Sequence, residues 1–196
     1  MSMEGGREIA LAARARDRTV GRATADGDVG MRDVEQLFVS CERALGKFLV
    51  QMVADRTLAE DLLQDVFHDA VRGRRQLAVA DSPVAWLYGI ARNHALSAVR
   101  RRGRFHRALE ALKLQRRSGG AESDYEIVAV RDLLERHLSG EDRALVVLRY
   151  LHGFDARELG SITGLSAEAV RQRLSRARRV LVEASSQARP EWEESH

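Results

Sequence analysis

The chain has 196 residues, 44% of them hydrophobic, which is enough for one ordinary domain or two small ones with buried cores. Lys and Arg outnumber Asp and Glu by 32 to 29, so the net charge of +3 does not by itself indicate a partner. The single cysteine, Cys41, excludes an intramolecular disulfide and a cysteine-based metal cluster, and no apolar run is long enough for a membrane span. We therefore expect a reduced cytoplasmic protein without a metal or cofactor.

The N-terminal segment mixes Gly, Ala, Arg and Asp without an aromatic residue, which predicts a flexible extension over residues 1–32. The stretch IALAARA within it could instead form a short helix. Met31 offers an alternative translation start, a hypothesis that an intact-mass measurement of the native protein would test.

From Val34 onward, apolar residues recur three or four positions apart, which predicts a series of helices and no convincing strand. The second helix is expected to begin at Thr57 as N-cap, because Glu60 three residues later completes a capping box. The third is expected to follow Ser82 as N-cap, with Pro83 at the first helical position.

Residues 104–124 carry charges, a glycine pair and few large apolar side chains, which indicates a linker. Helical periodicity resumes near Tyr125, and residues 185–196 form a tail. The sequence thus predicts an all-α chain in which two small helical domains, 33–103 and 125–184, are joined by a flexible linker.

The second domain contains the stretch GLSAEAVRQRLSRARRVL, which has five arginines and no acid between Arg171 and Arg179. On a helix, one side of this stretch is apolar and consists of Val170, Leu174, Ala177 and Leu181. The preceding DARELGSITGLS supplies a short helix, a turn at Gly164 and a cap at Ser166, which is the spacing of a helix-turn-helix. The outward face, with Arg178 on its flank, carries side chains that reach DNA bases and phosphates: Glu168, Arg171, Gln172, Ser175, Arg176 and Arg179.

A second basic segment lies in and after the first domain, where nine Lys or Arg and one acid fall between Arg92 and Arg117. Two separate basic surfaces are typical of a protein that contacts a polyanion twice. Arginine-rich helices that are merely solvated are the alternative.

The segment EDRALVVLRYLHGFDARELGSITGLSAEAVRQRLSRARRVL resembles region 4 of bacterial sigma factors, which recognises the minus-35 promoter element. AEDLLQDVFHDAV resembles region 2.2, and SPVAWLYGIARNHALSAVRRRGR resembles regions 2.3 and 2.4 of the extracytoplasmic-function (ECF) branch. The resemblance covers about residues 33–183 in the family's order, without room for a full region 3. Ser139 stands where the family usually has proline, and residues 167–169 and Gln172 differ from the commoner pattern, so the promoter sequence stays open.

The resemblance implies that the helix near residues 58–72 docks on the beta-prime coiled coil of core RNA polymerase, and that the beta flap is a further contact. The side of this helix opposite its apolar residues presents Asp61, Gln64, Asp65, His68 and Arg72. A plain solvated face is the alternative.

The resemblance also implies that the following helix reads and melts the minus-ten element, while the loop at about residues 74–82 captures an extruded base. The candidates for contacts with this element are Trp86, Arg92, Asn93, Leu96, Arg100 and Arg101. Trp86 fits core packing equally well, and we expect His94 to be a packed core histidine.

The sequence offers no paired nucleophile and base and no phosphate-binding glycine loop, so we do not expect an enzyme or a small-molecule substrate. The leading hypothesis is an ECF sigma factor that binds core polymerase and promoter DNA, is restrained by an anti-sigma factor, as the family implies, and does not insert into a membrane itself. A stand-alone helix-turn-helix regulator and an interaction module that mimics a sigma factor are the alternatives.

Overall fold

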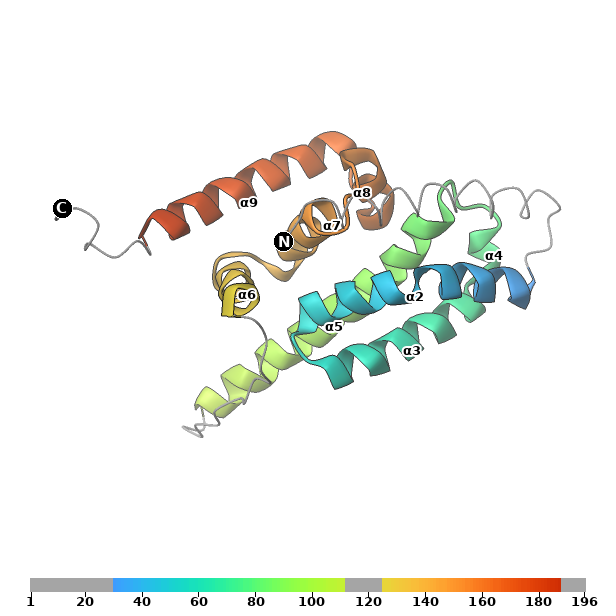
Figure 1. Ribbon diagram of the computed structural model, residues 1–196, viewed down its shortest axis with the longest axis horizontal. Coiled ribbons are helices and arrows are strands. Elements are labelled where there is room, and N and C mark those ends of the chain that lie inside the picture. Colours follow the sequence, from blue (N-terminus) through green and yellow to red (C-terminus); the bar gives the residue numbers. More distant parts are fainter. Residues whose placement is uncertain (1–29, 112–124, 188–196) are drawn as a thin grey trace.

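A computed structural model describes residues 30–111 and 125–187, and every element within these residues is a helix (Figure 1). The all-α prediction is therefore confirmed. The predicted N-terminal extension, the core of the predicted linker and the tail lie outside the described residues, apart from their ends. The helices are α2 (Met31–Val53), α3 (Arg56–Arg72), α4 (Arg74–Leu77), α5 (Pro83–Ala111), α6 (Tyr125–His137), α7 (Gly140–Tyr150), α8 (Ala156–Thr163) and α9 (Ala167–Gln187).

The first half of the structure is a bundle of α2, α3 and α5, with the single turn of α4 at one end (Figure 1). Apolar residues at helical spacing face its core, because a helix of about 3.6 residues per turn brings positions three and four apart onto one side. The largest fully buried side chains here are those of Leu37, Leu45, Phe48, Leu49, Met52, Leu62, Leu77, Leu87 and Tyr88.

The helix starts of the first half agree only in part with the sequence. Thr57 was predicted as the N-cap of the second helix, but α3 begins two residues earlier, because the Asp55 carboxylate accepts a hydrogen bond from the Leu58 amide. The start of α5 is as predicted: the Ser82 hydroxyl accepts from the Ala85 amide at 3.1 Å, and Pro83 is the first helical residue.

The end of α5 differs from the predicted domain boundary. The sequence placed a linker from residue 104, but α5 continues to Ala111, so residues 104–111 extend the helix. Arg104 and Arg107 are compatible with this extension, since arginine is a good helix former.

The second half consists of α6 to α9, and α8 and α9 form the predicted helix-turn-helix (Figure 1). Asp155 caps α8 through bonds from two amides, and Ser166 caps α9 by accepting from the Ala169 amide. Gly164 ends α8 with φ of 75°, a left-handed conformation that favours glycine. Ser139, which replaces the family's usual proline, caps α7 by accepting from the Asp142 amide.

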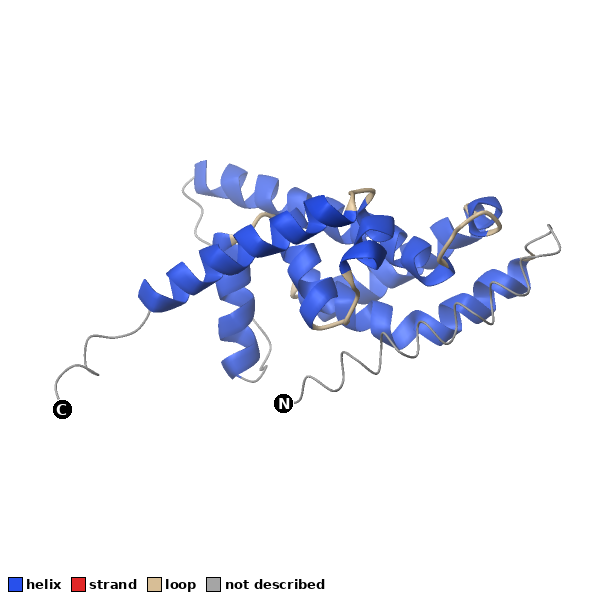
Figure 2. Ribbon diagram, turned by 90° about the horizontal axis from the view of Figure 1, so that it is seen from above, coloured by secondary structure: helices blue, strands red, loops and turns tan. Residues whose placement is uncertain are grey.

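The two halves lie against each other, with α5 packed on α7 and α8 and α2 packed on α7 (Figures 1 and 2). The buried apolar residues form one continuous core that runs from Val34 in α2 to Ala177 in α9. The helix α9 lies along the outside of this assembly (Figure 1). No helix within the described ranges is long and apolar enough to cross a membrane.

Candidate nucleic-acid interface

The helix α9 separates its side chains as its sequence predicts. Val170, Leu174 and Ala177 are buried and Leu181 is half-buried, so the apolar stripe packs onto the core. The opposite side is accessible to a ligand, since all six predicted minus-35 residues are exposed: Glu168, Arg171, Gln172, Ser175, Arg176 and Arg179.

The first turn of α9 carries a small polar network. The Glu168 carboxylate accepts from the Arg171 guanidinium at 2.8 Å and from the Gln172 amide at 3.4 Å. The hydrogen bond from Arg171, followed by that from Gln172, lowers the pKa of Glu168, so its carboxylate is ionised at neutral pH. An anionic acceptor thus stands beside cationic and amide donors at the end of the helix that a helix-turn-helix directs toward base edges.

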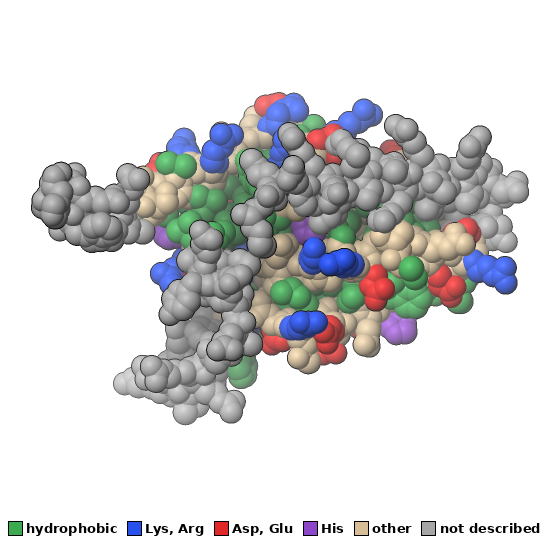
Figure 3. Space-filling model, viewed as in Figure 1, with side chains coloured by type: hydrophobic (Ala, Val, Ile, Leu, Met, Phe, Trp, Pro, Cys, Tyr) green, Lys and Arg blue, Asp and Glu red, His purple; other side chains and the backbone are tan. Residues whose placement is uncertain are grey.

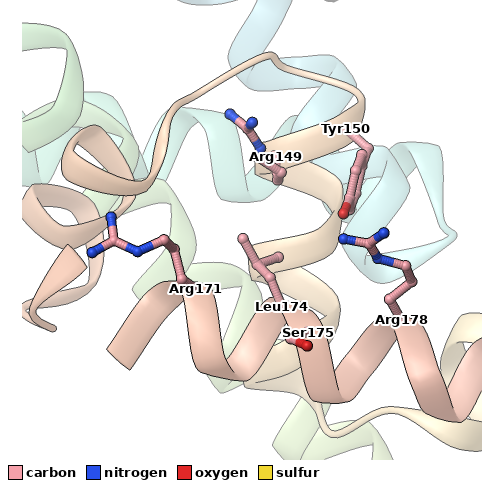
Figure 4. A pocket seen from close by; sticks show the side chains of 6 residues that line it. All are labelled: Arg149, Tyr150, Arg171, Leu174, Ser175 and Arg178. Carbon is pink, nitrogen blue, oxygen red and sulfur yellow. The ribbon is translucent and has the colours of Figure 1, made fainter. Parts of the chain in front are cut away.

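A groove of about 610 Å³ runs between the end of α7 and one flank of α9 (Figure 4). Arg149 and Tyr150 line it from α7, and Arg171, Leu174, Ser175 and Arg178 line it from α9. Arg178 extends toward the hydroxyl end of Tyr150 in Figure 4, and the Arg149 guanidinium donates to the Phe154 carbonyl at 2.9 Å. The lining offers three guanidinium groups and two hydroxyls, but Arg149 already bonds the Phe154 carbonyl and Arg171 the Glu168 carboxylate, which leaves Arg178 beside the two hydroxyls for an anion (Figure 4).

Sequence reasoning missed Arg149 and Tyr150 as members of this basic surface. The only signal was an exposed basic and aromatic pair at the end of a predicted helix, and nothing in the sequence pattern places that end beside α9. Lys and Arg side chains gather along the upper edge of the molecule in Figure 3, where Figure 1 shows α9.

The outer face of α3 is a separate accessible surface. All five residues predicted there are exposed, namely Asp61, Gln64, Asp65, His68 and Arg72. Arg72 forms an ion pair with Asp69 of its own helix at 3.4 Å. The helix buries Ala59, Leu62, Val66 and Ala70 on its other side.

The predicted minus-ten residues of α5 do not share one accessible surface. Asn93, Arg100 and Arg101 are exposed, and Trp86 is half-buried and packs against the core near Gly73. Leu96 was predicted to face DNA, but it is only 3% exposed. It is covered by the start of α7, where a Cβ built on Gly140 would lie 3.2 Å from its Cδ2 atom.

The environment of Arg92, like that of Leu96, differs from the one that the sequence predicts. Its side chain is 12% exposed and forms an ion pair with Glu141 at the start of α7. Arg100 approaches the same carboxylate at 3.8 Å. Two of the arginines proposed for DNA phosphates therefore contact an acid from the other half of the chain.

The loop before α5 is partly helical, because Arg74–Leu77 form α4, and Val79 beside it is 82% exposed. His94 is not simply a packed core histidine: its Nε2 atom lies 2.8 Å from the Asp69 carboxylate. Across the part of the chain that the structure describes, no group of three or more His, Cys, Asp or Glu is arranged to hold a metal ion.

Comparison with known families matches both halves of the chain. The sigma-70 region 2 family matches residues 37–105, and the sigma-70 region 4 family matches residues 128–181. The RNA polymerase sigma factor CarQ of Myxococcus xanthus is 31% identical over 144 residues, which cover 72% of this chain and 83% of CarQ. The chain belongs to the ECF sigma factors of the sigma-70 family.

Other sigma factors support this assignment. The probable RNA polymerase sigma factor RfaY of Xanthomonas campestris is 29% identical over 153 residues, which cover 73% of this chain but only 38% of RfaY. The sigma factor RpoE of Bartonella quintana, solved in complex with the anti-sigma factor NepR, superimposes with a TM-score of 0.63 at 26% identity, covering 81% of this chain and 99% of RpoE. CnrH, solved in complex with the cytosolic domain of CnrY, gives a TM-score of 0.64 at 25% identity, covering 88% and 99%.

The two family matches assign the helices of this sigma factor to regions. Region 2 comprises most of α2, then α3, α4 and α5 as far as residue 105. Region 4 comprises most of α6, then α7 and α8 and the larger part of α9. The contact between Arg92 and Glu141 therefore joins region 2 to region 4.

Proposed function

We propose that this ECF sigma factor binds core RNA polymerase, recognises minus-35 and minus-ten promoter elements, and promotes DNA opening at the start of transcription. The observation that carries the proposal is the exposed arginine-rich face of α9, presented by a capped helix-turn-helix. The chemistry of RNA synthesis belongs to the polymerase, so the role of this chain is specificity and strand separation.

The outer face of α3 is the proposed contact with the beta-prime coiled coil. Asp61 and Asp65 lie one helical turn apart and are both exposed, so a basic partner surface can meet them together. The face is polar and solvated, which fits an interface that forms and dissociates. We propose the beta flap as a second contact, through region 4.

The minus-35 element is the proposed ligand of α9. Glu168, Arg171 and Gln172 lie in its first turns, where recognition helices contact base edges, while Arg176 and Arg179 are suited to phosphates. The groove between α7 and α9 extends this surface with Arg149 and Arg178, which adds phosphate contacts beside the helix.

The minus-ten element is the proposed ligand of α5 and the loop before it. Asn93, Arg100 and Arg101 are accessible, whereas Arg92 is largely covered and paired with Glu141. Val79 in the exposed loop is an apolar surface beside which an extruded base can lie. Leu96 is not included, because it is buried.

An anti-sigma factor is the proposed regulator. The solved RpoE is described in complex with an anti-sigma factor, and the solved CnrH in complex with the cytosolic domain of CnrY. Both structures align over 99% of their own length with this chain, and we propose that this sigma factor is likewise bound by a protein inhibitor.

The test is run-off transcription with purified core polymerase on a pool of genomic promoter fragments, with and without this protein. We expect discrete new transcripts, and we expect them to vanish in the double variant Asp61→Lys/Asp65→Lys, because reversed charges repel a basic partner. The matched control is Glu42→Lys/Glu183→Lys, which changes the net charge equally at two exposed acids outside α3.

Transcripts that persist in the α3 variant would refute the proposed polymerase contact. If wild-type protein gave no transcripts and no complex with core enzyme but bound duplex DNA alone, the chain would act as a stand-alone regulator instead.

A further inference from the structure

One side of α9 combines unpaired arginines with an exposed apolar residue. Five exposed residues at intervals of three or four positions share this side: Arg171, Ser175, Arg178, Arg179 and Val182. We call this side the basic stripe. Among the residues that the structure describes, Arg178 and Arg179 have no ion-pair partner, and Val182 is 56% exposed. The basic stripe therefore offers two uncompensated positive charges and an apolar surface to a partner.

The basic stripe borders the groove between α7 and α9 (Figure 4). Arg178 belongs to both, and in the groove it lies beside the hydroxyls of Tyr150 and Ser175. A guanidinium and two hydroxyls are donors from which a carboxylate accepts hydrogen bonds. An acidic side chain that lies along the basic stripe therefore has a place beside Arg178.

The segment that follows α9 in the sequence carries the opposite charge. Residues 188–196, ARPEWEESH, contain three Glu and one Arg, and Trp192 lies among the glutamates. Pro190 does not continue an α-helix, because its ring removes the amide donor and clashes with the preceding turn. Charge complementarity and an aromatic side chain make this acidic segment a fitting occupant of the basic stripe.

The length of the acidic segment matches the distance that it has to cover. The helix axis from the end of α9 back to Arg178 is about 14 Å long, at about 1.5 Å per helical residue. Four extended residues after Pro190 span about 13 Å, at about 3.3 Å per residue, so Glu194 returns to the level of Arg178. Trp192 likewise returns by about 7 Å, which is the level of Val182.

We propose that residues 188–196 dock along the basic stripe of α9, with Trp192 against Val182 and Glu194 beside Arg178, and compete there with DNA. The competition, though not the docking itself, rests on the proposed minus-35 role of α9. Exposed ion pairs contribute little one at a time. The contact of Trp192 with Val182 is therefore the expected anchor, while the glutamates hold arginines that would otherwise contact phosphates.

The docked segment is an intramolecular competitor of DNA. It lowers the apparent affinity for DNA in proportion to the fraction of molecules in which α9 is free. If about one molecule in five is free, the apparent Kd is about fivefold higher than that of an unoccupied α9. Removing either the anchor or the negative charges of the segment therefore tightens DNA binding.

The first test measures binding of a short fluorescent duplex DNA of mixed sequence to the full chain. Trp192→Ser should bind about fivefold more tightly than wild type, although it changes no charge, because it removes the anchor. Glu193→Gln/Glu194→Gln should also bind more tightly. The matched control Glu35→Gln/Glu42→Gln removes the same charge at two exposed positions of α2 and should gain less than about twofold.

The second test locates the segment by disulfide formation, which needs Cα atoms within about 7 Å of each other. Glu194→Cys/Arg178→Cys should form an intramolecular disulfide about tenfold faster than Glu194→Cys/Arg176→Cys, since Arg176 lies about 200° around the helix from Arg178. Both pairs remove the same charges, and Cys41 is buried and stays unreactive. The oxidised Arg178→Cys pair should bind the duplex DNA about tenfold more weakly than the same protein after reduction.

Three outcomes would overturn the proposal. Equal disulfide rates in the two pairs, or a disulfide-linked dimer in place of the intramolecular bond, would refute docking of the segment on its own α9. A Trp192→Ser variant that binds DNA no more tightly than wild type would refute the competition. Transcripts from the wild-type chain with core polymerase test the proposed function separately, so a failure of that function is distinguishable from a failure of this inference.

Discussion

The most informative single residue is His152, because it is buried between the two regions and uses both ring nitrogens. Burial, assisted by the charge of Lys47, lowers its pKa to about 4, so the folded protein holds it neutral at physiological pH. A neutral ring can donate from Nε2 to Gln51 and accept from the Tyr88 hydroxyl, whose own pKa burial raises. Protonation would place a buried charge against the rings of Phe48 and Tyr88.

The burial of His152 therefore predicts that acid destabilises the folded protein. Below the unfolded pKa of about 6.5 the unfolded chain binds a proton that the folded chain does not bind until about pH 4, so the free energy of unfolding falls as the pH falls through this window. Between about pH 7 and pH 5 this residue should account for a loss of about 2 kcal/mol. Urea unfolding at both pH values should show that loss in wild type and not in His152→Gln, and an equal loss in both proteins would contradict the assignment.

At the scale of elements, the local sequence predicts the ends of the helices most directly. Ser82 and Ser166 cap their helices as the sequence indicates, and Gly164 makes the turn of the helix-turn-helix. The Thr57 prediction was wrong because Asp55 also caps well, and the two candidates lie too close together for the sequence to decide. The chain between α2 and α3 also needs a left-handed residue, which is Ala54.

Two opposite substitutions test whether the left-handed backbone conformation of Gly164 and Ala54 affects stability. Gly164 has φ of 75° with open space around its Cα, so Gly164→Ala should lower the free energy of unfolding by about 1 kcal/mol through backbone strain alone. Ala54 has φ of 57°, so Ala54→Gly should raise it by a similar amount. Chemical denaturation of both variants is the measurement, and a shift of the same sign in both would show that φ is not the cause.

At the scale of the whole molecule, Arg143 joins region 4 to the end of α2 through a buried hydrogen bond to the Met52 carbonyl. Arg143→Met keeps much of the apolar volume but leaves the Met52 carbonyl without its charged donor, so it should cost about 1.5 to 3 kcal/mol of unfolding free energy. The matched control is Arg136→Met, which removes an exposed ion pair with Asp132 at 3.8 Å and should cost less than about 0.5 kcal/mol. Equal effects in thermal or urea unfolding would mean that the buried contact is not important for stability.

The sequence by itself determined the helical class, the two regions, the apolar stripe of α9 and its exposed opposite face, because these follow from periodicity and capping within one element. It also placed the exposed side of α3, since a helix with one buried side leaves the other to solvent. The roles of these faces in binding polymerase and DNA remain predictions.

Only the tertiary structure decided which faces of α5 stay accessible. On a regular helix, Leu96 and Arg92 lie on the same side as Asn93. In the structure, however, the start of α7 covers Leu96, and Glu141 forms an ion pair with Arg92. The groove between α7 and α9 likewise depends on the packing of these two helices, which places Arg149 and Arg178 in the lining of one groove. Helical periodicity specifies the direction of a side chain relative to its own axis, whereas burial and ion pairing depend on a neighbour that lies tens of residues away in the chain.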